Sequence, residues 1–137
     1  MQQSLRTNNV ADEIALGTEA MDVMMKLSVL HFRSIGQPQR VRFIARKGSY
    51  HGSSVSMLAL GHNQRRRMMY TGVLALQGLN ISHVSRAHAF RDSPEGETEA
   101  EYVARLAKEL EDEFQRVGPE TVCAFVAESI VGAVSSI

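Results

Sequence analysis

Gly17 and Thr18 stand at the start of a predicted helix, where their chemistry suits a phosphate group. The first turn of a helix offers unpaired backbone N–H groups and the positive end of the helix dipole. The glycine lets a ligand approach the backbone closely, and the threonine hydroxyl adds a hydrogen bond. A simple helix cap is the alternative interpretation of the same pair.

Two further stretches carry side chains suited to binding. Tyr50 and His51 lie on a loop between Gly48 and Gly52, which allows the aromatic ring to present its face to a flat ligand. Packing of that ring against the core is the alternative. Glu128 follows a continuous apolar run, and burying an unpaired carboxylate is costly, so it should find a partner or reach a cleft. A helix cap or an ordinary ion pair is the alternative for this residue.

The first helix is predicted from its apolar spacing and its end signals. Thr18 is a candidate N-cap, and Gly36 and Pro38 stop the segment. Four apolar residues follow one another at helical spacing: Ala20, Val23, Met24 and Leu27.

A strand and a short helix are predicted next. Residues 41–46 combine β-branched and aromatic side chains between chain breakers, which favours a strand leading into the glycine-bounded loop 47–52. Ser53 or Ser54 then caps a short helix, and Gly61 ends it. Residues 62–80 give no readable pattern.

The clearest helix signal is the capping box that Thr98 and Glu101 form after a polar loop. Glu101 and Arg105 are spaced to pair one turn apart, and Gly118 with Pro119 ends the helix. The apolar stripe behind the box consists of Val103, Leu106, Ala107, Leu110, Phe114 and Val117.

The order of the elements predicts an α/β fold. Residues 81–85 form a short predicted strand, and the apolar run 121–127 fits a strand covered on both faces, as in a mostly parallel sheet flanked by helices. Helices and strands alternate, which implies a layered α/β architecture. Ligands of such sheets gather at the carboxyl ends of the strands, where the three stretches would meet.

Composition excludes several classes of protein. Fifteen basic residues balance fifteen acidic ones, which argues against a nucleic-acid-binding module, and the run Arg65–Arg67 is interpreted as a solvated face. No secretory signal or membrane-length apolar run is present, so we expect a cytoplasmic protein without a membrane partner. The single cysteine, Cys123, is expected to be a buried thiol. The seven methionines, including the pairs at 24–25 and 68–69, are expected to fill the core.

The five histidines show no zinc-motif spacing, so no metal ligands are predicted. They are scattered along the chain: His31, His51, His62, His83 and His88.

Taken together, the three binding stretches resemble the class-III aminotransferase family. Residues 17–20, Gly-Thr-Glu-Ala, are similar to the family's glycine-serine/threonine-glutamate-alanine motif. Residues 43–52 resemble its strand and Tyr-His-Gly loop, and residues 124–128 resemble its strand ending in glutamate. The similarity runs from about residue 14 to residue 134, with the three motifs in the family's order and spacing.

The resemblance implies a fold, a cofactor and site residues. Residues 14–137 would be part of the large domain of a fold-type-I pyridoxal-phosphate enzyme, after a poorly defined N-terminal segment, 1–13. Gly17 and Thr18 would hold the phosphate of pyridoxal 5'-phosphate. Tyr50 would stack on its ring with His51 beside it, and Glu128 would line the site near the ring and the substrate. The complete enzyme would be a homodimer that moves an amino group from an amino donor to a keto acid or aldehyde.

The chain also departs from the family pattern. Leu16 stands where the family usually has serine, Ser129 stands where it usually has proline, and residues 10–15 replace an apolar strand. The family's pyridine-nitrogen aspartate and Schiff-base lysine lie beyond residue 137. Three lysines are present, and none matches the catalytic position: Lys26, Lys47 and Lys108.

We therefore expect this chain alone to be catalytically inactive, with no catalytic residues of its own. An alternative is a non-enzymatic remnant that pairs with a full-length relative. A second alternative is an unrelated α/β domain that binds a nucleotide phosphate, although the chain has neither G-x-G-x-x-G nor a P-loop. Missing neighbour strands would leave an unpaired sheet edge that promotes association.

Overall fold

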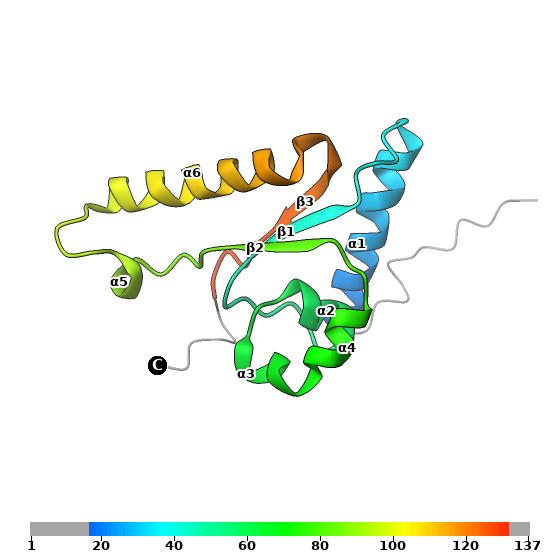
Figure 1. The fold of residues 1–137 in the computed structure, drawn as a ribbon, viewed down its shortest axis with the longest axis horizontal. Helices are drawn as coiled ribbons and strands as arrows, with labels where there is room; N and C mark the ends of the chain where they lie inside the picture. Colours follow the sequence, from blue (N-terminus) through cyan, green and yellow to red (C-terminus); the bar gives the residue numbers. More distant parts are fainter. Residues whose placement is uncertain (1–16, 132–137) are drawn as a thin grey trace, which may run out of the picture.

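Three parallel strands form the centre of the structure. The computed structural model describes residues 17–131. The middle strand, β1 (Arg42–Arg46), pairs in parallel with β2 (Ile81–Val84) on one side and with β3 (Val122–Val126) on the other (Figure 1). The predicted α/β fold with a parallel sheet flanked by helices is confirmed.

Alternate residues of β1 enter two separate cores. Phe43 and Ala45 belong to one buried cluster, together with Met57, Leu60 and Cys123. The intervening residue, Ile44, belongs to a second cluster with Val84 and Val122. Because successive side chains of a strand point to opposite faces, the clusters lie on opposite faces of the sheet. Burial raises the pKa of the Cys123 thiol, which is the buried cysteine that the sequence predicts.

Helix α1 (Gly17–Ser34) covers the first face and is the helix that the apolar spacing predicts. Met21, Met25, Val29 and Phe32 pack on the sheet, whereas Met24 and Leu27 are 55% and 46% exposed. Apolar residues surround much of this helix, so spacing alone does not decide which of them face the sheet. The helix also begins at Gly17, which places Thr18 inside the first turn instead of at the cap.

The short helix α2 (Val55–Leu60) completes that face as predicted. Ser54 is its N-cap and accepts a hydrogen bond from the Met57 N–H, and Gly61 is its C-cap. Met57 and Leu60 are among the most deeply buried side chains.

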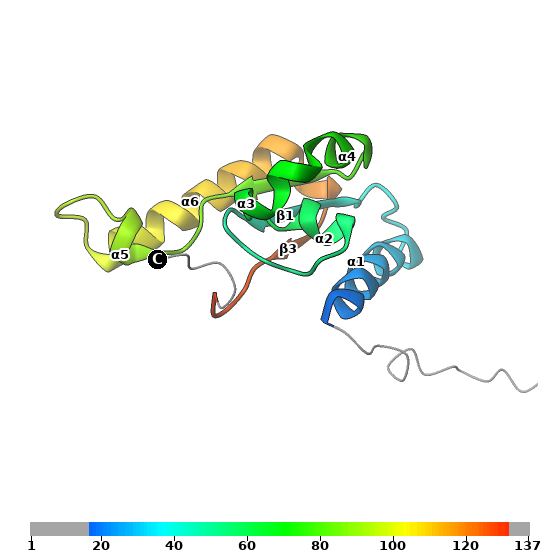
Figure 2. The same cartoon turned by 90° about the horizontal axis from the view of Figure 1, so that it is seen from below.

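Helix α6 (Glu99–Val117) covers the opposite face of the sheet (Figure 2). Its predicted capping box is present, with Thr98 and Glu101 hydrogen-bonded in both directions. The predicted pair of Glu101 with Arg105 is wrong, because Glu101 serves the cap and Arg105 pairs with Glu97 at 2.7 Å. Leu110, Phe114 and Val117 pack on the sheet as predicted, whereas Val103 is exposed. Gly118 ends the helix with a φ of 88°, and the 3-10 turn η3 (Pro119–Thr121) leads into β3.

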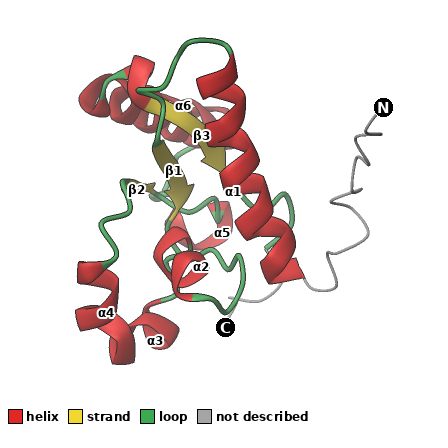
Figure 3. Ribbon diagram, turned by 90° about the vertical axis from the view of Figure 1, so that its right-hand side faces the viewer, coloured by secondary structure: helices red, strands yellow, loops and turns green. Residues whose placement is uncertain are grey.

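Residues 62–80, for which the sequence gives no clear pattern, form short helical turns next to α2 (Figure 3). They are α3 (Gln64–Arg67), the 3-10 turn η2 (Met68–Tyr70) and α4 (Thr71–Leu76); α5 (Ala89–Asp92) follows β2. Each is one or two turns long, too short for a helical period to show in the sequence. Met68 and Met69 are exposed here, as is Met24 in α1, so the prediction that these methionines fill the core is wrong.

Candidate functional site

The carboxyl ends of β1 and β3 meet at the switch point of the sheet. From β1 the chain moves to β2 on one side, and it then crosses over to β3 on the other side. Loops that leave neighbouring strands in opposite directions open a crevice between them, where open α/β sheets bind their ligands. The loop 47–52 follows β1, and Glu128 follows β3.

A hydrogen bond joins two of the predicted site residues, one from the loop after β1 and one from just after the end of β3. The backbone N–H of Tyr50 donates to Oε2 of Glu128 at 3.1 Å. The carboxylate that the sequence expects to need a partner therefore has one, and the partner is the aromatic loop. This contact ties together segments that are far apart in the sequence.

The start of α1 holds the same loop from the other side. Thr18 Oγ1 accepts a hydrogen bond from the Ser53 N–H at 3.2 Å, and Ser54 Oγ donates to Asp22 Oδ2 at 3.0 Å. Gly52 permits this approach, because a Cβ atom there would lie 2.7 Å from Thr18 Oγ1. The structure thus brings Gly17 and Thr18, Tyr50 and His51, and Glu128 together around one loop.

His51 is the least satisfied side chain of this site. It is 9% exposed, and its Nε2 atom has no hydrogen-bond partner among residues 17–131. Burial lowers the pKa of His51, and the nearby negative charge of Glu128 opposes that shift. A buried polar atom without a hydrogen-bond partner costs free energy, so His51 Nε2 could gain a hydrogen bond from a bound ligand.

The ring of Tyr50 already has a neighbour on one face. The guanidinium of Arg66 lies 4.4 Å from the ring centroid, in cation–π geometry. A flat ligand that stacks on Tyr50 must use the other face or displace Arg66. The cavity beside Tyr50 and Gly52 has a volume of only about 10 Å³, so the binding surface is open and not an enclosed pocket.

The basic run is the solvated face that the sequence predicts at Arg65 and Arg66, which are exposed, but not at Arg67, which is half-buried. Arg66 covers Tyr50, and Arg67 donates to the carbonyl oxygens of Ala59 and Gly61 at the end of α2. The contacts of Arg66 and Arg67 cannot be predicted from the neighbouring sequence, because their partners come close only when the chain folds. Asp22, which holds Ser54, is missed for the same reason.

The three lysines lie where the sequence places them. Lys26 is part of α1, Lys108 is part of α6 and pairs with Asp112, and Lys47 follows β1. Leu16 and residues 1–15 lie outside the described residues, as do residues 132–137.

Two negative findings apply to the part of the chain that the structure describes. Between Gly17 and Val131, no three His, Cys, Asp or Glu side chains gather in a way that could hold a metal ion. Over the same residues, no helix combines the length and apolar character needed to cross a membrane.

His83 connects β2 to the end of α2 and titrates far from its usual range. Its Nε2 lies 3.0 Å from the Leu60 carbonyl oxygen, and its ring contacts that of His62 at 4.9 Å between centroids. Burial lowers the pKa of His83 to about 4. The folded protein therefore keeps this imidazole neutral at a pH where the unfolded chain protonates it.

We expect the free energy of unfolding to fall as the pH drops from about 6.5 to about 4, because only the unfolded chain gains the His83 proton in that window. Urea unfolding at pH 7.5, 6 and 5 measures it. A His83→Gln variant should lose part of this slope, whereas His31→Gln, on the exposed side of α1, should keep it. Equal slopes in both variants would contradict the assignment.

A family model described as "Aminotransferase class-III" matches residues 8–136. Among curated proteins, an aminotransferase of Gibberella zeae is 48% identical over 119 residues, which are 85% of this chain and 23% of that protein. A mitochondrial gamma-aminobutyrate transaminase 1 of Solanum lycopersicum is 38% identical over 123 residues, 85% of this chain and 22% of that protein.

Solved structures show the same similarity. An omega-transferase from Vibrio fluvialis JS17 superposes with a TM-score of 0.74 at 35% identity, over 85% of this chain and 26% of that chain. A transaminase with L-Ala superposes with a TM-score of 0.79 at 32% identity, over 88% of this chain and 27% of that chain. The chain thus spans about a quarter of the length of these relatives.

Proposed function

Because the chain belongs to the class-III aminotransferase family, we propose that residues 14–137 are part of the cofactor-binding domain of a pyridoxal-phosphate-dependent aminotransferase. The reaction of the complete enzyme is the transfer of an amino group from an amino donor to a keto acid or aldehyde. Homodimerisation, as the resemblance implies, belongs to the same proposal. The observation that carries it is the convergence of Thr18, Tyr50 and Glu128 on the loop after β1.

The residues present fit a flat, phosphorylated group. Helix α1 begins at Gly17, and the first turn of a helix has backbone N–H groups without an intrahelical acceptor, which suits a phosphate. The Thr18 hydroxyl accepts from the Ser53 N–H and donates to no acceptor among residues 17–131, so its proton is available to a ligand. The backbone of Gly52 lies so close to Thr18 that a side chain at position 52 would not fit. The unpartnered Nε2 of buried His51 provides a further polar contact.

Each residue has a distinct proposed role. Gly17 and Thr18 bind the phosphate, and Tyr50 stacks on the pyridine ring with the face that Arg66 leaves open. His51 lies beside the ring. Glu128 fixes the loop through the Tyr50 N–H and would line the site near the ring and the substrate.

The chemistry of the reaction is divided between the cofactor and the protein. Bound pyridoxal phosphate supplies an electron sink for the carbon that carries the amino group. The residues of this chain bind and orient that group.

Pyridoxine 5'-phosphate tests this proposal directly. It has the ring and the phosphate of the cofactor but no aldehyde that could react with lysines. We expect it to bind to the chain, and Thr18→Val to weaken binding roughly tenfold or more, since one hydrogen bond to a charged phosphate is lost. Isothermal titration calorimetry measures both affinities.

The matched control is Thr71→Val, the same substitution at the exposed first residue of α4. It should leave the affinity unchanged. Absence of binding, or equal affinities for the Thr18→Val variant and the unmodified chain, would refute the proposed phosphate site.

A further inference from the structure

A second cleft lies on the other side of β1, between the carboxyl ends of β1 and β2. It has a volume of about 530 Å³, which is within the range of small-molecule sites. Its walls come from the residues after β1 and β2, from α3 and from the first turns of α6. Neither Tyr50 nor Glu128 lines it, so it is separate from the proposed cofactor surface.

The cleft is rich in positive charge although the whole chain has a net charge of zero. Four cationic side chains line it, with Asp92 as the lining carboxylate: Lys47, Arg65, Arg86 and Arg105. Arg86 binds both carboxylate oxygens of Asp92 at 2.6 and 2.7 Å, which neutralises that acid. Arg105 is likewise paired with Glu97.

Two cations in the cleft have no direct partner in the described part of the chain, although the charge of Lys47 contributes to lowering the pKa of Glu113, after the Arg116 and Ser82 contacts of that carboxylate. Among residues 17–131, the Lys47 ammonium and the Arg65 guanidinium form neither a hydrogen bond nor an ion pair. His62 also lines the cleft, and its pKa is lowered mainly by burial and by the charge of Arg67. The positive charge of Lys47 adds a smaller lowering of the same pKa. Ammonium and guanidinium groups that converge on one space favour a ligand with more than one negative charge.

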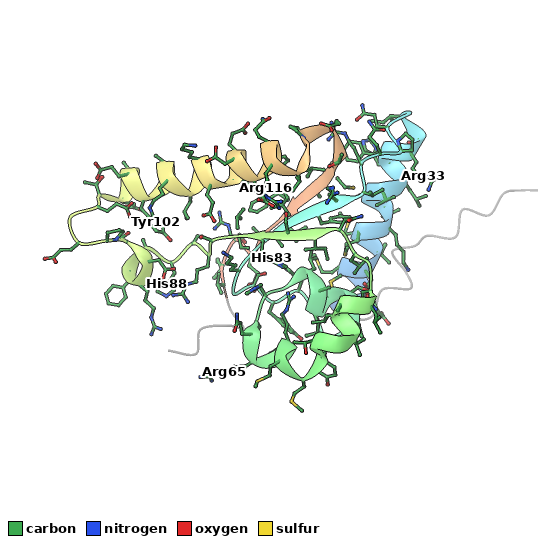
Figure 4. All side chains as sticks on the ribbon, in the orientation of Figure 1. Arg33, Arg65, His83, His88, Tyr102 and Arg116 are labelled. Atoms are coloured by element: carbon green, nitrogen blue, oxygen red, sulfur yellow. The ribbon has the colours of Figure 1, made fainter. Side chains whose placement is uncertain are left out.

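The walls of the cleft are held by hydrogen bonds before any ligand arrives. The Tyr102 hydroxyl accepts from the His88 N–H at 2.8 Å and donates to the Arg86 carbonyl oxygen at 3.3 Å. Glu109 accepts from both the N–H and the hydroxyl of Ser85. Figure 4 shows Tyr102 on α6 above His88, and Arg65 lower in the same view on α3.

From this arrangement we infer that the cleft binds a compact polyanion, carrying phosphate groups or several carboxylates, between Lys47 and Arg65. The two free cations contact the ligand directly. The paired Arg86 and Arg105 form a positively polarised wall behind it, because their ion pairs leave further N–H groups unused. The inference does not rest on the proposed function, since it uses neither the cofactor nor the residues assigned to it.

The test is a titration of the purified chain with inorganic pyrophosphate and, separately, with citrate, at low and at high ionic strength. We expect at least one of them to bind, and binding to weaken as ionic strength rises. The double variant Lys47→Gln/Arg65→Gln should weaken it roughly tenfold or more, because two charge-assisted contacts are lost. Neither side chain has a hydrogen bond among the described residues, so the variant should keep the fold.

The control variant Lys26→Gln/Arg33→Gln removes the same charge from α1, and Figure 4 shows Arg33 at the end of that helix, far from Arg65. It should leave the affinity unchanged. Binding of pyrophosphate alone supports a phosphate ligand, and binding of citrate alone supports a polycarboxylate. Absence of binding, or an equal loss in both double variants, would overturn the inference. Thr18→Val should affect pyridoxine 5'-phosphate and not pyrophosphate, which keeps the two sites distinguishable.

Discussion

Replacing Gly52 with alanine should destabilise the chain by about 2–4 kcal/mol, from backbone strain together with a steric clash. Gly52 has a φ of 143°, a conformation that residues with a side chain rarely adopt. The new methyl group would lie 2.7 and 2.9 Å from the Thr18 side chain and 3.0 Å from Met57 Cγ. Thr18 is β-branched and fixed in a helix, so relief requires α1 to move away from the loop.

Urea unfolding followed by circular dichroism measures this change in the free energy of unfolding. The control is Gly72→Ala in α4, where the added Cβ meets nothing within 4 Å. That substitution should be neutral or stabilising by roughly 0.5–1 kcal/mol, because alanine favours a helix over glycine. If both variants unfold at the same urea concentration, loop 47–52 and α1 are not packed together as described.

The Ile44→Ala variant should lose about 2–5 kcal/mol of stability, the range for emptying a large apolar site in a core. Ile44 is fully buried at the centre of the middle strand, and it packs between β2, β3 and α6. Its truncation therefore leaves a cavity where all of these elements meet. In a small domain, a loss of this size is a large part of the total stability.

Ile130→Ala is the matched control, since Ile130 is 86% exposed. It should change the free energy of unfolding by no more than about 0.5 kcal/mol. Chemical unfolding of both variants under identical conditions gives the comparison. A loss below about 1 kcal/mol for Ile44→Ala would mean that α6 does not cover the sheet.

Local signals in the sequence predicted much of the fold. The capping box at Thr98 and Glu101, the cap at Ser54 and the stop at Gly118 each act through residues within a few positions, so they can be read without the fold. The apolar run that contains Val122 and Cys123 was predicted as a strand covered on both faces, because such a strand has no polar side.

Contacts between distant segments explain what the sequence did not predict. In α1, Met21 and Met24 are equally apolar, and only the position of the sheet decides which of them is buried. Arg105 has acidic neighbours on both sides, and the capping box, which occupies Glu101, leaves Glu97 as its partner.

The candidate site was predicted as a set of residues but not as a geometry. Motif order pointed to Thr18, Tyr50 and Glu128, whereas their hydrogen bonds to the loop after β1 arise from the strand order. The cover of Tyr50 by Arg66 could not be read from the sequence, because the loop and α3 approach each other only in the fold. The roles of these residues toward a cofactor remain a prediction for the titrations above.

The strand order also bears on how the chain acquires its structure. The register joins Arg42 to Val122, so the central strand gains its second neighbour only from the last element of the described chain. Pairings between residues so distant in sequence form slowly, because a long loop must close before they contribute. During synthesis on the ribosome, the β1–β3 pairing therefore cannot form until α6 and β3 have been made, and one edge of β1 stays unpaired until then.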